Sequence, residues 1–130
     1  MMIMSEFPSI DEVHDMLDEI AEEIPKDFFR ELNQGILLLP QHKIHPESRA
    51  RDKLYIMGEY HKNITGRQII IYYGSFKRFY QEISKERLYQ KLKDTLLHEF
   101  THHLESLAGE KGLEIKDARD LYKYKNRHKD

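Results

Sequence analysis

One stretch of the chain, from Ser84 to Leu107, repeats large apolar residues at the spacing of an α-helix. Residues that recur every three or four positions gather into one stripe along a helix, and such a stripe must be buried. Its members are Leu88, Leu92, Leu96, Phe100, Leu104 and Leu107. We therefore expect a long amphipathic helix around which the rest of the domain is packed.

The same helix carries the motif H-E-x-x-H, in which the named residues are His98, Glu99 and His102. Residues four apart lie one helical turn apart on the same face, so the two histidines can bind one metal ion. Glu99 lies beside them, where its carboxylate can accept a proton from water that the metal activates. On a helical wheel the three residues fall on an arc next to the apolar stripe. The helix can therefore pack by one face and present the motif to a cleft by another.

The motif supplies two ligands, whereas a hydrolytic zinc site usually has three from the protein. The chain has no cysteine, so the third ligand must be a histidine or a carboxylate. Glu105 borders the arc of the histidines, but three ligands from one straight helix strain a tetrahedron, and Glu105 can instead orient a histidine. Gly109 and Gly112 predict a helix break, after which Glu114, Asp117 or Asp120 can return to the site. Taken singly, each of these acids is more often a surface carboxylate.

Two helices are expected before the first strand. Ser9 is a predicted N-cap, and Glu12 completes a capping box with it. Apolar residues continue at helical spacing until Pro25, which ends this helix or starts the next. A short second helix around Phe28 is predicted to end near Gly35, which can take a positive φ.

Three strands are expected in the middle of the chain. The first is the apolar run 36–39, the second is 54–61, and the third is 68–73, where Gly74 and Ser75 end the pattern. The sequence 63–66 is a turn signal, so the second and third strands can form a hairpin. Gly58 in the second strand marks a bulge or a close approach of another group.

Length and composition favour one α+β domain over residues 1–130. The chain has 130 residues, of which 39% are hydrophobic and 34% charged, enough for one modest core. We expect a three- or four-stranded mixed sheet packed against the motif helix, with flanking N- and C-terminal helices. The C-terminal helix is predicted over 113–124, and residues 1–8 and 125–130 are predicted to be loose termini.

Charge and hydropathy exclude several kinds of partner. The net charge is −2, with 21 basic and 23 acidic residues, so no nucleic-acid partner is indicated. No apolar run approaches the roughly 20 residues of a membrane span, and no signal peptide is indicated. We therefore expect a cytoplasmic protein without a membrane partner, and the sequence leaves its oligomeric state open.

The segment from Thr95 to His103 resembles the minimal zincin-like metallopeptidase family of bacteria. Similar features are Ile24-Pro25 with Phe28 and Leu32-Asn33, then 54–60 and 69–72, so the resemblance covers about residues 24 to 121. It implies a compact zincin-like α/β fold that binds one Zn²⁺, and a peptidase activity. It also implies that an extended peptide lies antiparallel to an edge strand above the motif helix, with 54–61 as the candidate edge.

The third ligand does not follow directly from this resemblance. The family pattern is H-E-x-x-H-x-x-G-x-x-D, but Glu105 stands at its glycine and Ala108 at its aspartate. The segment 115–121 resembles the family's aspartate segment displaced by an insertion. On that alignment Asp117 takes the ligand role, ahead of Glu105 and then Asp120.

The expected function is hydrolysis of peptide bonds by metal-activated water, with Glu99 as the general base and His98, His102 and Asp117 as zinc ligands. The alternative is a non-catalytic structural or regulatory module in which zinc holds the C-terminal segment onto the motif helix. A third reading is a metal-free interaction domain, in which the motif is a coincidental polar face.

Overall fold

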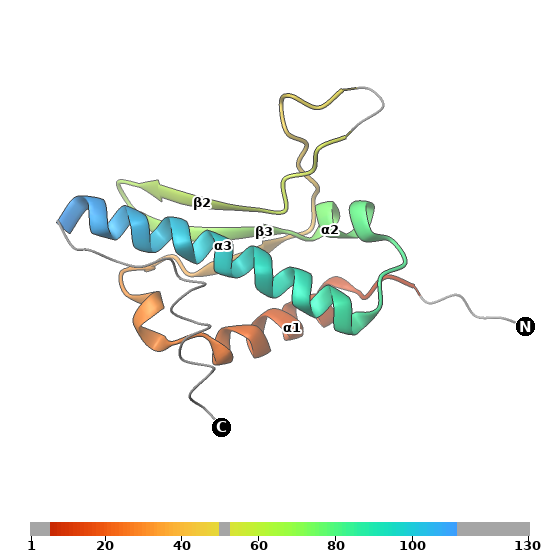
Figure 1. Ribbon diagram of the computed structural model, residues 1–130, viewed down its shortest axis with the longest axis horizontal. Helices are drawn as coiled ribbons and strands as arrows, with labels where there is room; N and C mark the ends of the chain where they lie inside the picture. Colours follow the sequence, from red (N-terminus) through yellow and green to blue (C-terminus); the bar gives the residue numbers. More distant parts are fainter. Residues whose placement is uncertain (1–5, 50–52, 112–130) are drawn as a thin grey trace, which may run out of the picture.

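The structure of the chain, a computed structural model, describes residues 6–49 and 53–111 (Figure 1). In chain order the elements are α1 (Ile10–Glu23), the 3₁₀ helix η1 (Lys26–Phe29), β1 (Ile36–Leu39), β2 (Gly58–Asn63), β3 (Gly66–Tyr72), α2 (Tyr73–Tyr80) and α3 (Lys85–Lys111). The predicted α+β fold, with a small mixed sheet against the motif helix, is confirmed. None of the described helices is long and apolar enough to cross a membrane.

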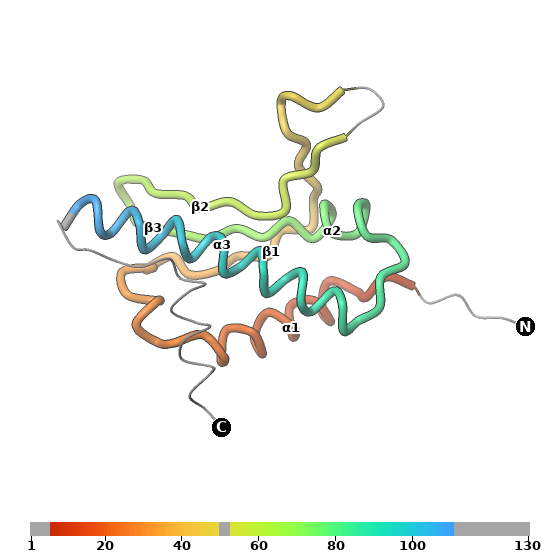
Figure 2. The backbone as a smooth tube through the Cα atoms, viewed as in Figure 1, coloured from red at the N-terminus to blue at the C-terminus, as the bar shows by residue number. Residues whose placement is uncertain are grey.

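The sheet has the order β1-β3-β2, so that β3 is central and β2 is at an edge. β1 pairs parallel with β3, and β2 pairs antiparallel with it in the predicted hairpin. Asn63 organises the turn, because its side-chain oxygen accepts hydrogen bonds from the backbone N–H groups of Thr65 and Gly66. Figure 2 shows how the hairpin runs alongside α3. β2, which lies beside the motif helix, therefore has one side that pairs with no other strand of the described sheet.

α3 supplies the centre of the core, as its apolar stripe predicts. All six stripe residues are buried, and the first five, from Leu88 to Leu104, pack with α1 and with the face of β3 that carries Ile69 and Ile71. Ser84 caps the start of α3, because its hydroxyl accepts a hydrogen bond from the N–H of Arg87 at 3.2 Å. The motif helix is thus held by a continuous core along most of its length.

The N-terminal elements follow local signals. Ser9 caps α1, and the capping box with Glu12 is complete. Gly35 has φ +68°, as predicted, but the short helix is a 3₁₀ helix that already ends at Phe29. Gly35 instead closes a later turn, in which its N–H donates to the Leu32 carbonyl at 3.1 Å. Phe7 and Pro8 differ from the expected loose terminus: Pro8 is buried, and its carbonyl accepts a hydrogen bond from the Tyr73 hydroxyl at 2.6 Å. Residues 125–130 lie outside the described part of the chain.

The second strand begins four residues later than predicted. Tyr55 makes only an isolated bridge with Ile44, and residues 41–49 and 53–57 form an arm that leaves the sheet (Figure 1). The arm is joined to itself by the bond from Ile56 N–H to the Lys43 carbonyl, at 2.9 Å. It rejoins the sheet where the Met57 carbonyl accepts the N–H of Tyr72. The arm therefore ends directly at the start of β2.

Helix α2 does not follow from the sequence pattern, in which Gly74 and Ser75 indicate only the end of a strand. The helix forms here since Tyr73 and Phe76 on one of its faces reach the core, with Phe76 fully buried. Gly74 is required for a close approach: a Cβ there would lie 2.6 Å from the main-chain carbon of Gln41. Its N–H donates to the carbonyl of the same Gln41 at 3.1 Å.

The predicted helix break at Gly109 is wrong, since α3 continues to Lys111. A glycine in a helix costs about 1 kcal/mol relative to alanine. Contacts of the last turns offset that penalty, because Leu107 is buried and Glu110 pairs with Arg67 of the hairpin. The final helix predicted over 113–124 lies outside the described residues.

Candidate metal and catalytic site

The two motif histidines lie together on the exposed face of α3. The Nε2 atoms of His98 and His102 are 3.1 Å apart, with the rings edge to face. Two nitrogen ligands about 2.05 Å from a tetrahedral zinc ion would be roughly 3.4 Å apart. The same pair of nitrogens therefore already has nearly the separation that zinc requires, and the donor set fits this metal.

Glu99 lies about 100° around the helix from His98, and it is buried with 6% of its surface exposed. Burial, and in second place the negative charge of Glu59, raises the pKa of Glu99 to about 7. A carboxyl group with a pKa near neutrality can both accept and release a proton at physiological pH. Its position and its pKa suit a general base.

A cleft of about 300 Å³ opens beside His98 and Glu99. From α3 it is also lined by Asp94 and Thr95, and from the end of the arm and the start of β2 by Ile56, Met57 and Gly58. Gly58 allows the close approach of another group that the sequence predicted, and the group that approaches it is helix α3. A Cβ at Gly58 would lie 3.1 Å from Cγ2 of Thr95. The glycine thus lets the motif helix sit directly against the edge strand.

The third ligand is not found among the described residues. Glu105 is exposed on α3, and its carboxylate does not form a three-ligand group with His98 and His102 in the described part of the chain. Asp117, the favoured candidate, lies outside the described residues, as do Asp120 and Glu114. His98 and His102 are therefore paired on α3, and His98 lines the same cleft as Glu99. Completion of the site by a third ligand stays a prediction.

A different group of ligand-type side chains lies on α1, where His14, Asp15 and Asp18 have ligand atoms within 4.8 Å of one another. All three side chains are exposed, and His14 Nδ1 pairs with the Asp18 carboxylate at 3.3 Å along the helix. Exposed acidic groups of this kind usually reflect a solvated helix face. They lie on a different helix from the motif and contribute nothing to its cleft.

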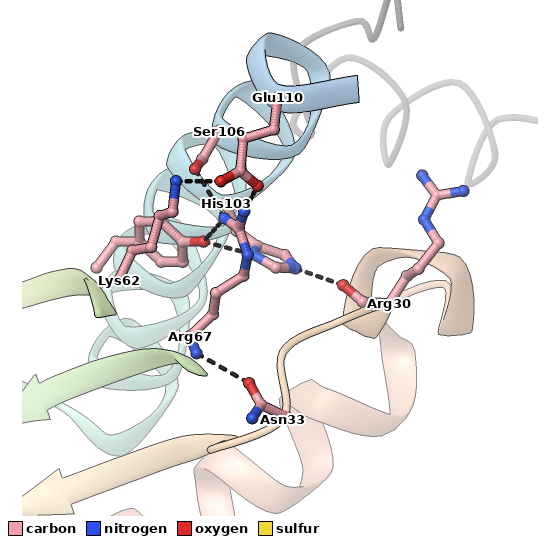
Figure 3. Close-up of polar contacts among 8 residues, drawn as sticks. Arg30, Asn33, Lys62, Arg67, His103, Ser106 and Glu110 are labelled. Atoms are coloured by element: carbon pink, nitrogen blue, oxygen red, sulfur yellow. Dashed lines mark hydrogen bonds and ion pairs between the residues drawn. The ribbon is translucent and has the colours of Figure 1, made fainter. Parts of the chain in front are cut away.

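A buried polar network supports α3 one residue beyond the motif (Figure 3). His103 is fully buried, and its Nε2 lies 2.7 Å from the carbonyl oxygen of Arg30. A carbonyl can only accept, so Nε2 must donate, and Nδ1 of the neutral ring accepts the hydroxyl hydrogen of Tyr60 at 2.9 Å. Burial lowers the pKa of His103, which favours this neutral form. The position of His103 beside a motif histidine, about 100° around the helix, agrees with a core or supporting role.

Arg67 continues the network toward the end of α3. Its Nη1 donates to the Tyr60 hydroxyl at 2.6 Å and to the Ser106 hydroxyl at 2.7 Å. Its other terminal nitrogen pairs with Glu110, which also pairs with Lys62 (Figure 3). The network ties β2, β3 and α3 together. Sequence reasoning missed it, since Arg67 and Glu110 are 43 residues apart and neither belongs to a motif.

A second polar cluster tethers the arm to the sheet. The Glu59 carboxylate accepts hydrogen bonds from Lys43 of the arm at 2.7 Å and from the Tyr72 hydroxyl at 2.5 Å. His61 lies 3.0 Å from the same carboxylate. Burial raises the pKa of Glu59, but these three partners outweigh burial and lower it to about 2. The arm is therefore fixed close to the position where it supplies Met57 to the cleft.

Comparison with known proteins places the chain in a family. No protein-family model and no curated protein matches it. The solved structures include a similar chain, described as a conserved hypothetical protein from Thermo thermophilus, with 32% sequence identity and a TM-score of 0.65. The match covers 78% of the present chain and 99% of that one. The chain therefore belongs to the same protein family as this conserved hypothetical protein.

Proposed function

We propose that the protein is a zinc-dependent peptidase. The observation that carries the proposal is the 3.1 Å separation of the His98 and His102 Nε2 atoms beside a buried Glu99. The resemblance of the motif segment to minimal zincin-like metallopeptidases supports the same chemistry. The chain has no cysteine, which suits a reducing compartment, and we propose the cytoplasm as its location.

Each part of the site has a separate role in this proposal. His98 and His102 would hold the zinc ion, which would supply Lewis-acid chemistry toward water and a carbonyl oxygen when bound. Glu99 accepts the proton of the attacking water and returns it to the leaving amine. β2 binds the substrate as an extended strand, since one side of β2 is the sheet edge and its main-chain groups can pair there.

For the third ligand we propose Asp117, which follows the described end of α3. The continuous helix supports a ligand from beyond it, because Ala108, at the family's aspartate position, is a helical residue without a donor atom. Replacement of Asp117 by Asn should lower zinc affinity by at least tenfold, whereas Asp120→Asn should leave it within a factor of about three. The reverse pattern, measured by competition with a chelating dye, would assign the ligand to Asp120.

The test of the function is the Glu99→Gln variant. It should keep about one equivalent of zinc and lose hydrolysis of a peptide pool by about 10²- to 10⁴-fold, which is the usual contribution of a general base. Glu86→Gln is the matched control, since Glu86 is an exposed glutamate in the first turn of the same helix.

The outcomes separate the proposal from its alternatives. Turnover that Glu99→Gln leaves unchanged would refute the proposed mechanism. A wild-type protein that binds zinc tightly, resists unfolding only when zinc is present and cleaves no peptide would instead be a non-catalytic zinc module. Purified protein without zinc, and without zinc uptake on titration, would leave a metal-free interaction domain.

A further inference from the structure

The cleft has one wall that metal binding and proton transfer do not use. Ile56 and Met57 form this wall at the end of the arm, and both side chains are half-buried. Met57 also packs against the hydrophobic core, so it is held from behind. An apolar wall within the same cleft as Glu99 is suited to contact with a substrate side chain.

The wall is preformed by bonds of its own main chain. The Met57 carbonyl accepts a hydrogen bond from the N–H of Tyr72 at 2.9 Å. The Ile56 N–H donates to the main-chain carbonyl of Lys43, also at 2.9 Å. The ion pair of Lys43 with Glu59 adds a side-chain tether at the same place. A pocket that is rigid before binding discriminates between ligands better than one that must be ordered.

The depth of the cleft is limited by the contact of Gly58 with Thr95. A Cβ on Gly58 would meet Thr95 Cγ2 at 3.1 Å and the carbonyl oxygen of Ile70 at 3.2 Å, so strand and helix already close the floor. The volume of about 300 Å³ is at the low end for ligand pockets. It accommodates one side chain with its adjoining main chain, rather than a series of side chains.

The charges around the cleft restrict which side chain can enter. Among the described residues that line it, the ionisable ones are Asp94, His98 and Glu99, and none is a lysine or an arginine. Apart from the proposed metal, the cleft offers a carboxylate side chain no cationic partner, and the negative charge of Asp94 in its lining would repel it. An aliphatic side chain gains from burial against Ile56 and Met57.

We propose that this cleft receives one aliphatic side chain of the peptide substrate, of about the size of leucine or methionine, next to the bond that is cleaved. Met57 and Thr95 set the size that is accepted. The inference rests on the proposed peptidase function and extends it by naming the substrate residue that the site selects.

The test uses peptides that differ at one residue, which is Leu, Met, Phe, Asp or Lys. Cleavage is followed with the zinc-loaded protein, and binding is measured by calorimetry with the Glu99→Gln variant. The Leu and Met peptides should be preferred over the Asp peptide by at least about tenfold in both assays. Met57→Ala should weaken binding and cleavage of the Leu peptide by about tenfold, which is the usual effect of removing a few methylene groups from an apolar pocket. The larger pocket should then favour the Phe peptide.

The matched control is Met16→Ala. Met16 is also a half-buried methionine packed against the core, but it lies on α1 and lines a different cavity. It should leave the order of preference unchanged. This control separates a general loss of stability from a change in selectivity.

The outcomes of the two proposals can be told apart. Cleavage without residue preference, or a preference that Met57→Ala leaves unchanged, overturns the inference and leaves the peptidase function standing. Selective binding that depends on Met57 but no cleavage supports the aliphatic pocket and refutes the peptidase function. Peptides that are neither bound nor cleaved overturn both.

Discussion

Removal of the Tyr60 hydroxyl is expected to destabilise the fold by about 3 kcal/mol, more than a tyrosine-to-phenylalanine change normally does. The hydroxyl donates to Nδ1 of His103 and accepts from Nη1 of Arg67. Both partners are buried, with His103 at 0% and Arg67 at 7% exposure. Replacing Tyr60 by Phe leaves both without this partner, at positions with little access to water.

The magnitude follows from the two interactions. A hydrogen bond to a charged group contributes about 1.5–3 kcal/mol, and a buried acceptor without a donor is penalised by about 1–3 kcal/mol. Arg67 keeps its bonds to Ser106 and Glu110, so the first contribution falls at the low end. Together they give about 3 kcal/mol, and for a domain of this length that corresponds to a decrease in Tm of roughly 10 °C.

The assay is urea unfolding at pH 7 followed by circular dichroism, with the midpoint and the slope m fitted separately. Tyr55→Phe is the matched control, because Tyr55 is a half-buried tyrosine of the arm that contacts the His42 ring edge-on. It should change stability by no more than about 0.5 kcal/mol. A loss below about 1 kcal/mol for Tyr60→Phe at unchanged m would refute the role assigned to the Tyr60 hydroxyl as the bridge between His103 and Arg67.

Four further perturbations test other parts of the structure. The folded-state pKa of Glu59, about 2, lies below the ordinary value of 4.5, so its stabilisation is present above pH 4.5 and is lost as the pH falls toward 2. Between about pH 5 and about pH 2.5 the Glu59→Gln variant should therefore lose less stability than the wild type, by up to about 3 kcal/mol. Urea midpoints over this pH range measure the difference. Gly74→Ala should cost about 2 kcal/mol, since its Cβ would clash with the main chain of Gln41. Gly109→Ala has open space around it in α3 and should instead stabilise by about 0.5–1 kcal/mol; equal signs for the two would contradict the packing described. Zinc at about 100 times its Kd should raise the stability of the wild-type protein by about 2.7 kcal/mol in thermal melts. It should leave the stability of the His98→Ala variant unchanged.

Much of the fold could be predicted from local patterns. The capping box of Ser9 and Glu12, the positive φ of Gly35 and the turn at Asn63 each depend on residues within three or four positions. The apolar stripe of the motif helix depends on a spacing that the structure preserves over its whole length. Interactions of this range are visible in sequence because the chain itself holds the partners together.

The candidate site divides in the same way. His98, Glu99 and His102 lie together because one helical turn brings them together, whatever the rest of the chain does. Their cleft is different, since Met57 reaches it from a distant segment of the chain, before β2. Neither the apolar wall nor the pKa of Glu99 could be predicted, because both depend on which elements pack over the helix.

The sequence by itself determined where most of the helices and strands form, which turn closes the hairpin and which helix face carries the motif. Only the tertiary structure decided that α3 continues through Gly109, because the pairing of Glu110 with Arg67 outweighs a weak local preference. It also decided that a helix forms around Gly74 and that Gly58 lies against Thr95. In each case the deciding partner is distant in sequence, and folding must bring it close before its contribution exists.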